Sequence, residues 1–119
     1  MAELKPDLTT LKQSIGAATG GDRALDAEIA STLKAPLAAF TGSVDAALEL
    51  IEHTLPGWGW HVGWHADGIR PYATLHDAER TRQVTAAGPS VPIALLRTMA
   101  QALEQNAVTA ADGEADSAR

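Results

Sequence analysis

The hydrophobic and polar positions change their period twice along the chain. Up to residue 55, and again from residue 90, apolar residues recur every three or four positions, which indicates amphipathic helices. Between them, the stretch GWGWHVGWHADGIRPYATLH (57–76) alternates, which is typical of strands with one covered face. Asp67-Gly68 interrupts the alternation and favours a two-residue turn, because a type I′ turn needs positive φ at both central positions. The pattern predicts a β-hairpin flanked by helices.

A turn at Asp67-Gly68 also fixes which residues of the two strands face each other. It predicts strands over about 58–66 and 69–76, paired so that Trp60 lies opposite Leu75. One face then collects the apolar residues Trp60, Val62, Trp64, Pro71, Ala73 and Leu75. The other face collects His61, Gly63, His65, Arg70, Tyr72 and Thr74, with His76 beyond them. We expect the apolar face to be covered, with Trp60 in the core, and Tyr72 to lie across the gap that Gly63 leaves.

Helices are expected on both sides of the hairpin in the sequence. The first runs from Pro6 to about Ala18, and the next two and the last begin at the capping residues Asp22, Ser43 and Ser90. Their apolar stripes include Leu8, Leu11 and Ile15; Leu25, Ile29 and Leu33; Val44, Leu48 and Ile51; and Ile93, Leu96, Met99, Ala100 and Leu103. The helices that carry Leu25, Val44 and Ile93 are expected to cover the Trp60 face.

Residues 82–87, centred on Val84, are predicted to form a third strand, whose charges suit a sheet edge. The predicted fold class is therefore α+β, with a small three-stranded antiparallel sheet (the hairpin plus an edge strand) packed with about four helices. The length of 119 residues suits one domain, which we place at 1–106. Residues 107–119 are small, acidic and aperiodic, which predicts a disordered tail.

Composition limits the classes of partner. The net charge of −6 argues against a nucleic-acid polymer as partner, because such binding depends on neutralised phosphates. From residue 57 to 90, however, Arg70, Arg80 and Arg82 balance three acidic residues, so a small anionic ligand fits there. The absence of cysteine excludes disulfides and thiolate metal sites. No apolar run has the length of a signal peptide or a membrane span, so we expect no membrane partner and a cytoplasmic location.

The sequence carries no motif of a known reaction. Neither a nucleophile elbow, nor a zinc-protease motif, nor a phosphate-binding glycine loop is present, so we expect no enzyme and assign no catalytic residue. His61 and His65 would lie roughly 13 Å apart on one strand, too far for one ion. His61 and His76 are diagonal, roughly 7–8 Å apart at the backbone, but no third ligand stands at a fixed spacing. We therefore expect neither a metal nor a cofactor.

The polar face of the hairpin combines side chains that suit a nucleotide. Aromatic rings can stack on a base, arginines can donate in pairs to phosphate, and histidines can contact ribose or phosphate. The predicted ligand-binding residues are Trp58, His61, Trp64, His65, Arg70, Tyr72, His76, Arg80 and Arg82. The alternative interpretation is a solvated sheet face with the tryptophans in the core. Spare apolar surface on so small a domain also favours a homo-oligomer.

Three segments carry a resemblance to a known group of proteins. ATGGDRALDAEIA (18–30), FTGSVDAALELI (40–51) and GWGWHVG (57–63) resemble small uncharacterised phage and prophage proteins over roughly Leu8 to Leu103. Gly21 stands where that pattern often has proline, and Phe40 where it often has tyrosine. The shared motifs are structural, so the resemblance implies a common fold, a phage origin and a place in the host cytoplasm, but no active residues.

The same resemblance suggests a function by analogy of class. Several small phage proteins of this build counter bacterial defence by sequestering cyclic or NAD-derived nucleotide signals. The expected function is thus a phage-encoded binding protein that sequesters a nucleotide immune signal without catalysis. The alternative is a phage structural or assembly accessory that acts through protein–protein contacts.

Overall fold

The computed structural model describes residues 4–64, 68 and 70–117, with side chains over 8–64, 68 and 70–106. This part of the chain forms α1 (Leu4–Ala17), α2 (Arg23–Leu33), α3 (Val44–Thr54), β1 (Gly59–Trp64), β2 (Pro71–His76), β3 (Gln83–Ala87) and α4 (Val91–Ser117). The three strands form one antiparallel sheet in the order β1-β2-β3. The predicted α+β class is therefore confirmed.

The strand register agrees with the sequence prediction at every described pair of the hairpin. Trp60 lies opposite Leu75, Val62 opposite Ala73 and Trp64 opposite Pro71. The predicted third strand is present as β3, with Val84 opposite Leu75. Of the predicted turn, Asp67 lies outside the described residues, while Gly68 has the positive φ of 70° that the turn requires.

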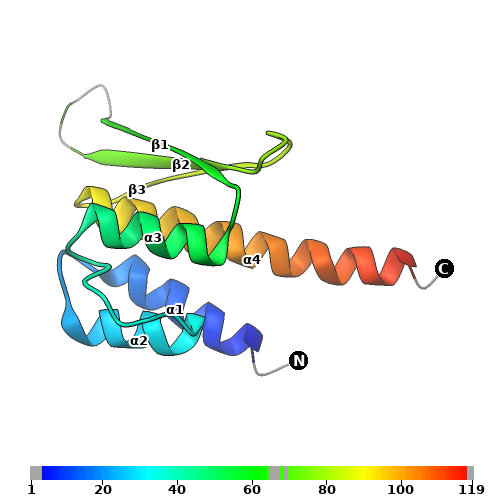
Figure 1. Cartoon of the computed structure of the whole chain (residues 1–119), viewed down its shortest axis with the longest axis horizontal. Helices are drawn as coiled ribbons and strands as arrows, with labels where there is room; N and C mark the ends of the chain where they lie inside the picture. The colour runs from blue at the N-terminus through cyan, green and yellow to red at the C-terminus, as the bar shows by residue number, and fades with distance from the viewer. Residues whose placement is uncertain (1–3, 65–67, 69, 118–119) are drawn as a thin grey trace.

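Helix α4 runs through the middle of the molecule. Figure 1 shows the sheet on one side of α4, α1 and α2 on the other, and α3 alongside. Other elements pack against α4 from several sides. Its residues 93–96 and 98–100 are therefore all buried, whereas a helix covered on one side would bury only one stripe of residues. The approach to the sheet is close: the buried Thr98 hydroxyl lies 3.1 Å from the Ala73 carbonyl oxygen of β2. A Cβ at Gly88 would lie 2.8 Å from the Ala94 backbone nitrogen, so this crossing needs glycine.

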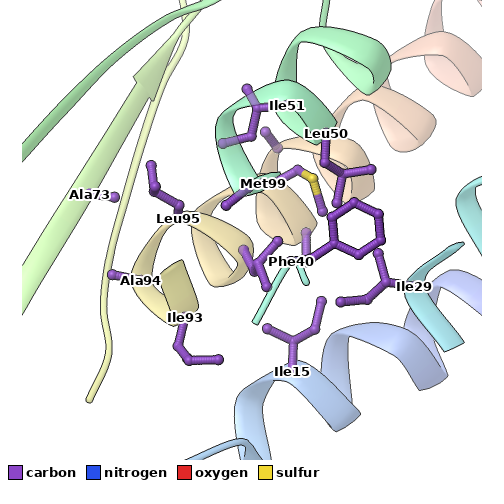
Figure 2. Packing of buried hydrophobic residues seen from close by; sticks show 14 of the residues in the cluster. Ile15, Ile29, Phe40, Leu50, Ile51, Ala73, Ile93, Ala94, Leu95 and Met99 are labelled. Carbon is purple, nitrogen blue, oxygen red and sulfur yellow. The ribbon is translucent and has the colours of Figure 1, made fainter. Parts of the chain in front are cut away.

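One hydrophobic core extends around α4, toward the sheet on one side and among the helices on the other (Figure 2). Ala73 of β2 lies near Ala94 and Leu95, whereas Met99 lies near Leu50 and Phe40 on the helical side. All six are buried. The small Ala73 and Ala94 allow the helix to approach the sheet, and the larger side chains fill the space among the helices.

The helices begin at the capping residues that the sequence indicates. Asp22 accepts a hydrogen bond from the Leu25 N–H at 3.1 Å, Ser43 from Ala46 at 3.2 Å and Ser90 from Ile93 at 3.4 Å. Each satisfies an N–H group that the first helical turn leaves without a backbone partner. Helix α1 begins at Leu4, slightly earlier than predicted, with Pro6 still in the tolerated first turn.

The predicted cover of the hairpin is wrong in one important respect. Among the described residues, only α4 makes extensive contacts with the sheet, and it does so with β2 and β3. The edge strand β1 extends beyond this cover, so Trp60 is 51% exposed and Trp64 59% exposed, although both project from the face that carries the buried Leu75. Helix α2, which carries Leu25, lies on the far side of α4 from the sheet, and α3, which carries the exposed Val44, lies beside α4 without extensive contacts to the strands.

The last helix also differs from the sequence prediction. Helix α4 continues to Ser117, through residues that we expected to belong to a disordered tail. The periodic apolar pattern does end near residue 106, but alanine has the highest helix propensity and the segment is rich in it. Within the described residues, no helix is sufficiently long and apolar to cross a membrane.

Candidate functional site

The open face of the sheet is the candidate site. Along β2, Tyr72, Thr74 and His76 alternate with residues that are buried against α4, so their side chains point away from the helices. The register places His61 of β1 on one side of Thr74 and Thr85 of β3 on the other. Thr74 and Thr85 share a hydrogen bond of 2.8 Å between their hydroxyl groups. Three strands therefore contribute side chains to one polar surface.

Two glycines of β1 make room for rings from β2. A Cβ at Gly63 would lie 2.7 Å from Oη and 2.8 Å from Cζ of Tyr72, so the tyrosine ring lies across this glycine as predicted. The ring of His76 covers Gly59 in the same way. The two rings thus extend over the neighbouring strand.

Tyr72 also approaches His61. Its hydroxyl oxygen lies 3.5 Å from His61 Nε2, and the ring centroids are 6.0 Å apart at an interplanar angle of 45°. The pair places a phenol and an imidazole, each able to donate or accept a hydrogen bond, at the same place on the open face.

A turn after β2 holds a cationic side chain beside these rings. The Asp77 carboxylate accepts hydrogen bonds from the Thr81 hydroxyl at 2.6 Å, the Thr81 N–H at 2.8 Å and the Arg82 N–H at 3.3 Å. The Thr81 hydroxyl, and then the two N–H groups and the Arg82 charge, lower the pKa of Asp77, with desolvation opposing them. Within this turn Arg80 adopts a left-handed φ of 58°.

These features surround one depression of about 430 Å³. It is lined by Trp60, His61, Tyr72, Thr74, His76, Arg80 and Gln83. No acidic side chain is among these described lining residues, whereas hydroxyl, imidazole, amide and guanidinium groups all are. The depression therefore offers several hydrogen-bond donors and at least one positive charge, which suits an anionic ligand.

The structure gathers four of the nine predicted ligand-binding residues: His61, Tyr72, His76 and Arg80. The other five do not join them. Trp58 is half-buried against the core, Trp64 projects from the opposite face, Arg70 is exposed ahead of β2, and Arg82 donates to the Asn106 side-chain oxygen at 2.6 Å. His65 lies outside the described residues.

Sequence reasoning missed three residues that line the depression: Trp60, Thr74 and Gln83. Thr74 was placed on the correct face but was not counted as a ligand-binding residue. Gln83 could have been found by extending the register to the third strand, since it lies opposite His76. Trp60 is predicted on the apolar face, from which its side chain does project, so the alternation gives no reason to expect it at the border of a depression on the other face.

Metal binding finds no support in the described part of the chain, where no group of three or more histidine, aspartate or glutamate side chains is placed to hold an ion. His61 and His76 both line the depression, but they lack a third ligand among these residues.

No protein-family model matches this chain, and neither a curated protein nor a solved structure shows significant similarity to it. The resemblance to small phage proteins therefore stays a prediction.

Proposed function

We propose that this protein binds a small anionic ligand of the nucleotide class on the open face of its sheet, and sequesters it. In full, the proposal is a phage-encoded protein that withdraws a nucleotide immune signal in the host cytoplasm. The observation that carries the ligand class is the convergence of His61, Tyr72, His76 and Arg80 on one depression without an acidic neighbour among the lining residues.

The size and chemistry of the depression support this ligand class. Its volume of about 430 Å³ falls within the range of roughly 300–1,000 Å³ that small-molecule sites occupy. Arg80 provides a planar guanidinium for phosphate, and the Tyr72 ring provides an apolar surface for a base. The Thr74 hydroxyl and the Gln83 amide are suited to ribose or phosphate oxygens.

The proposal requires binding without chemical change. Two carboxylates precede Arg80 in this turn: Glu79 is not among the residues that line the depression, and the oxygens of Asp77 already accept hydrogen bonds from Thr81 and Arg82. The Asp77 carboxylate therefore has a structural role in the turn, which supports a binding role for the site rather than general acid–base catalysis.

The test is to incubate the purified protein with a panel of cyclic nucleotides and cyclic ADP-ribose isomers. Free compound is then removed, the protein is heated, and the released material is identified by mass spectrometry. Intact release of one compound is the expected result, and release of a changed product would replace sequestration with enzymatic turnover.

A matched pair of arginine variants shows whether the depression is responsible. Arg80→Gln removes the guanidinium that lines it and should reduce retention at least tenfold. Arg70→Gln removes an exposed arginine that is not among the lining residues and should leave retention unchanged. Equal loss from both variants would indicate a nonspecific charge effect.

A second candidate function is that of a phage structural or assembly accessory protein. The exposure of Trp60 and Trp64 favours it, because large exposed rings are enriched in protein–protein contacts. Retention of no compound from the panel, together with co-purification of a virion protein, would support this function in place of sequestration.

A further inference from the structure

The outer edge of β1 lacks the usual protection of an exposed strand. Natural sheet edges carry charged residues, prolines or bulges that prevent pairing with another chain. Residues 57–64 contain no charged residue and no proline, and β1 pairs with β2 without a break in register. Its hydrogen-bonding edge therefore remains available to another strand.

The opposite edge strand of the sheet, β3, is held by contacts with α4. β3 contacts α4, and the Ala87 carbonyl at its end accepts a hydrogen bond from Arg97 at 3.1 Å. Arg82, just before β3, donates to Asn106 of α4. The contrast identifies β1 as the edge suited to an additional strand.

The uncovered side of β1 also exposes a row of apolar side chains. Trp60, Val62 and Trp64 project from the same face, with Val62 half-buried between the two exposed rings. An aromatic side chain has an area of up to ~250 Å², and about half of it is exposed in both Trp60 and Trp64. Together, the two tryptophans therefore expose roughly 250–300 Å². Two copies would thus bury roughly 500–600 Å² from the tryptophans alone, nearly half of the ~1,200 Å² at the lower limit of stable interfaces. The backbone and the remaining side chains of both strands would add to this area.

The strand is complementary to itself. In an antiparallel pair with Val62 on the two-fold axis, Trp60 of one copy lies opposite Trp64 of the other, and His61 lies opposite Gly63. The first pairing brings aromatic rings together, and the second brings each imidazole beside the Tyr72 ring that covers Gly63 of the other copy. Although each copy carries a net charge of −6, no charged side chain of residues 57–64 enters the contact.

We propose that β1 pairs with β1 of a second copy of this chain, so that two three-stranded sheets join into one six-stranded sheet. Trp60 and Trp64 of both copies are then covered. The two depressions on the open faces become neighbours across the two-fold axis. The proposal does not depend on the identity, or the existence, of a ligand.

Sedimentation velocity at micromolar protein concentration tests the proposal. The wild-type chain should have twice the monomer mass of 12.4 kDa. The double variant Trp60→Lys/Trp64→Lys should sediment as a monomer with an unchanged circular dichroism spectrum. Leu37→Lys, which alters a 70% exposed leucine on the connection before α3, should remain a dimer. A monomeric wild type, or a dimeric double variant, would overturn the proposal.

A measurement on the wild-type protein keeps the test decisive if the double variant fails to fold. Amide hydrogen exchange in β1 should slow as protein concentration rises through the dimer range, while exchange in β3 should not change. Concentration-independent exchange throughout β1 would contradict the pairing.

Discussion

At the scale of single residues, a glycine determines where the ring of Tyr72 lies. Gly63→Ala would introduce a Cβ into the space of that ring, 2.7 Å from Oη, so the ring must move away from His61. Tyr72 is half-buried at the open face, so displacing its ring should lower the melting temperature modestly. We expect ligand affinity to fall about tenfold, or roughly 1.4 kcal/mol, in a titration with the compound that the protein retains.

Gly16→Ala is the matched control, because a Cβ at that position meets nothing within 4 Å. It should leave affinity unchanged. Full affinity in Gly63→Ala would show that the position of the Tyr72 ring does not matter for binding.

The turn that carries Arg80 should depend on pH through Asp77. Its pKa is lowered in the folded protein, so the hydrogen bonds to Thr81 and Arg82 stabilise the fold above the ordinary carboxyl pKa and are lost as pH falls through the folded value. The melting temperature of Asp77→Asn should therefore be lower than that of wild type at neutral pH. The difference should shrink below about pH 4. A constant difference down to about pH 2 would contradict this role of the carboxylate.

Two neighbouring residues of the same sheet face should differ strongly in their effect on stability. Leu75 is fully buried under α4, so Leu75→Ala should lower the free energy of unfolding by about 2–5 kcal/mol. Trp60 is half exposed, so Trp60→Ala should cost only about 1–2 kcal/mol, below the ~3–5 kcal/mol of a core tryptophan. Urea unfolding at protein concentrations below the dimer range checks both values. Equal losses would mean that Trp60 is covered within a single copy.

At the scale of elements, the sequence predicts what local rules determine. The Asp67-Gly68 turn signal and strict alternation identify the register, and Asp22, Ser43 and Ser90 identify three helix starts. The cover of the sheet could not be predicted in this way. It depends on which helix crosses which strand, and alternation shows only that a face is apolar, not that a helix lies over it.

Arg97 connects elements that are far apart in the sequence. Its guanidinium donates to the carbonyl oxygens of Ile15, Gly16 and Ala18 at the end of α1, and to Ala87 at the end of β3. Arg97→Ala would remove all four contacts, although the Ile15 carbonyl would keep its bond from the Ala18 N–H, so the substitution should lower the free energy of unfolding by about 2–3 kcal/mol. Arg23→Ala removes an exposed arginine and should have almost no effect. Similar losses in urea unfolding would show that the carbonyl contacts of Arg97 add nothing.

At the scale of the whole molecule, the ligand proposal depends on the open face of the sheet, and the pairing proposal depends on the uncovered edge strand β1. The sequence placed His61, Tyr72 and His76 on that face because the hairpin register is local. It could not select among the three arginines. Arg80 reaches the depression because the Asp77 turn directs it there, whereas Arg82 bonds to Asn106 on α4, a partner that only the tertiary structure brings near.

The most direct test of the account is a backbone amide chemical-shift map, recorded on ¹⁵N-labelled protein during titration with cyclic mononucleotides and with cyclic ADP-ribose. At least one of these compounds should perturb the amides of His61, Tyr72, Thr74, His76 and Arg80, while those of α1 and α2 stay in place. Perturbations centred on the helices, or none with any of these compounds, would contradict the claim that the open face of the sheet binds nucleotides.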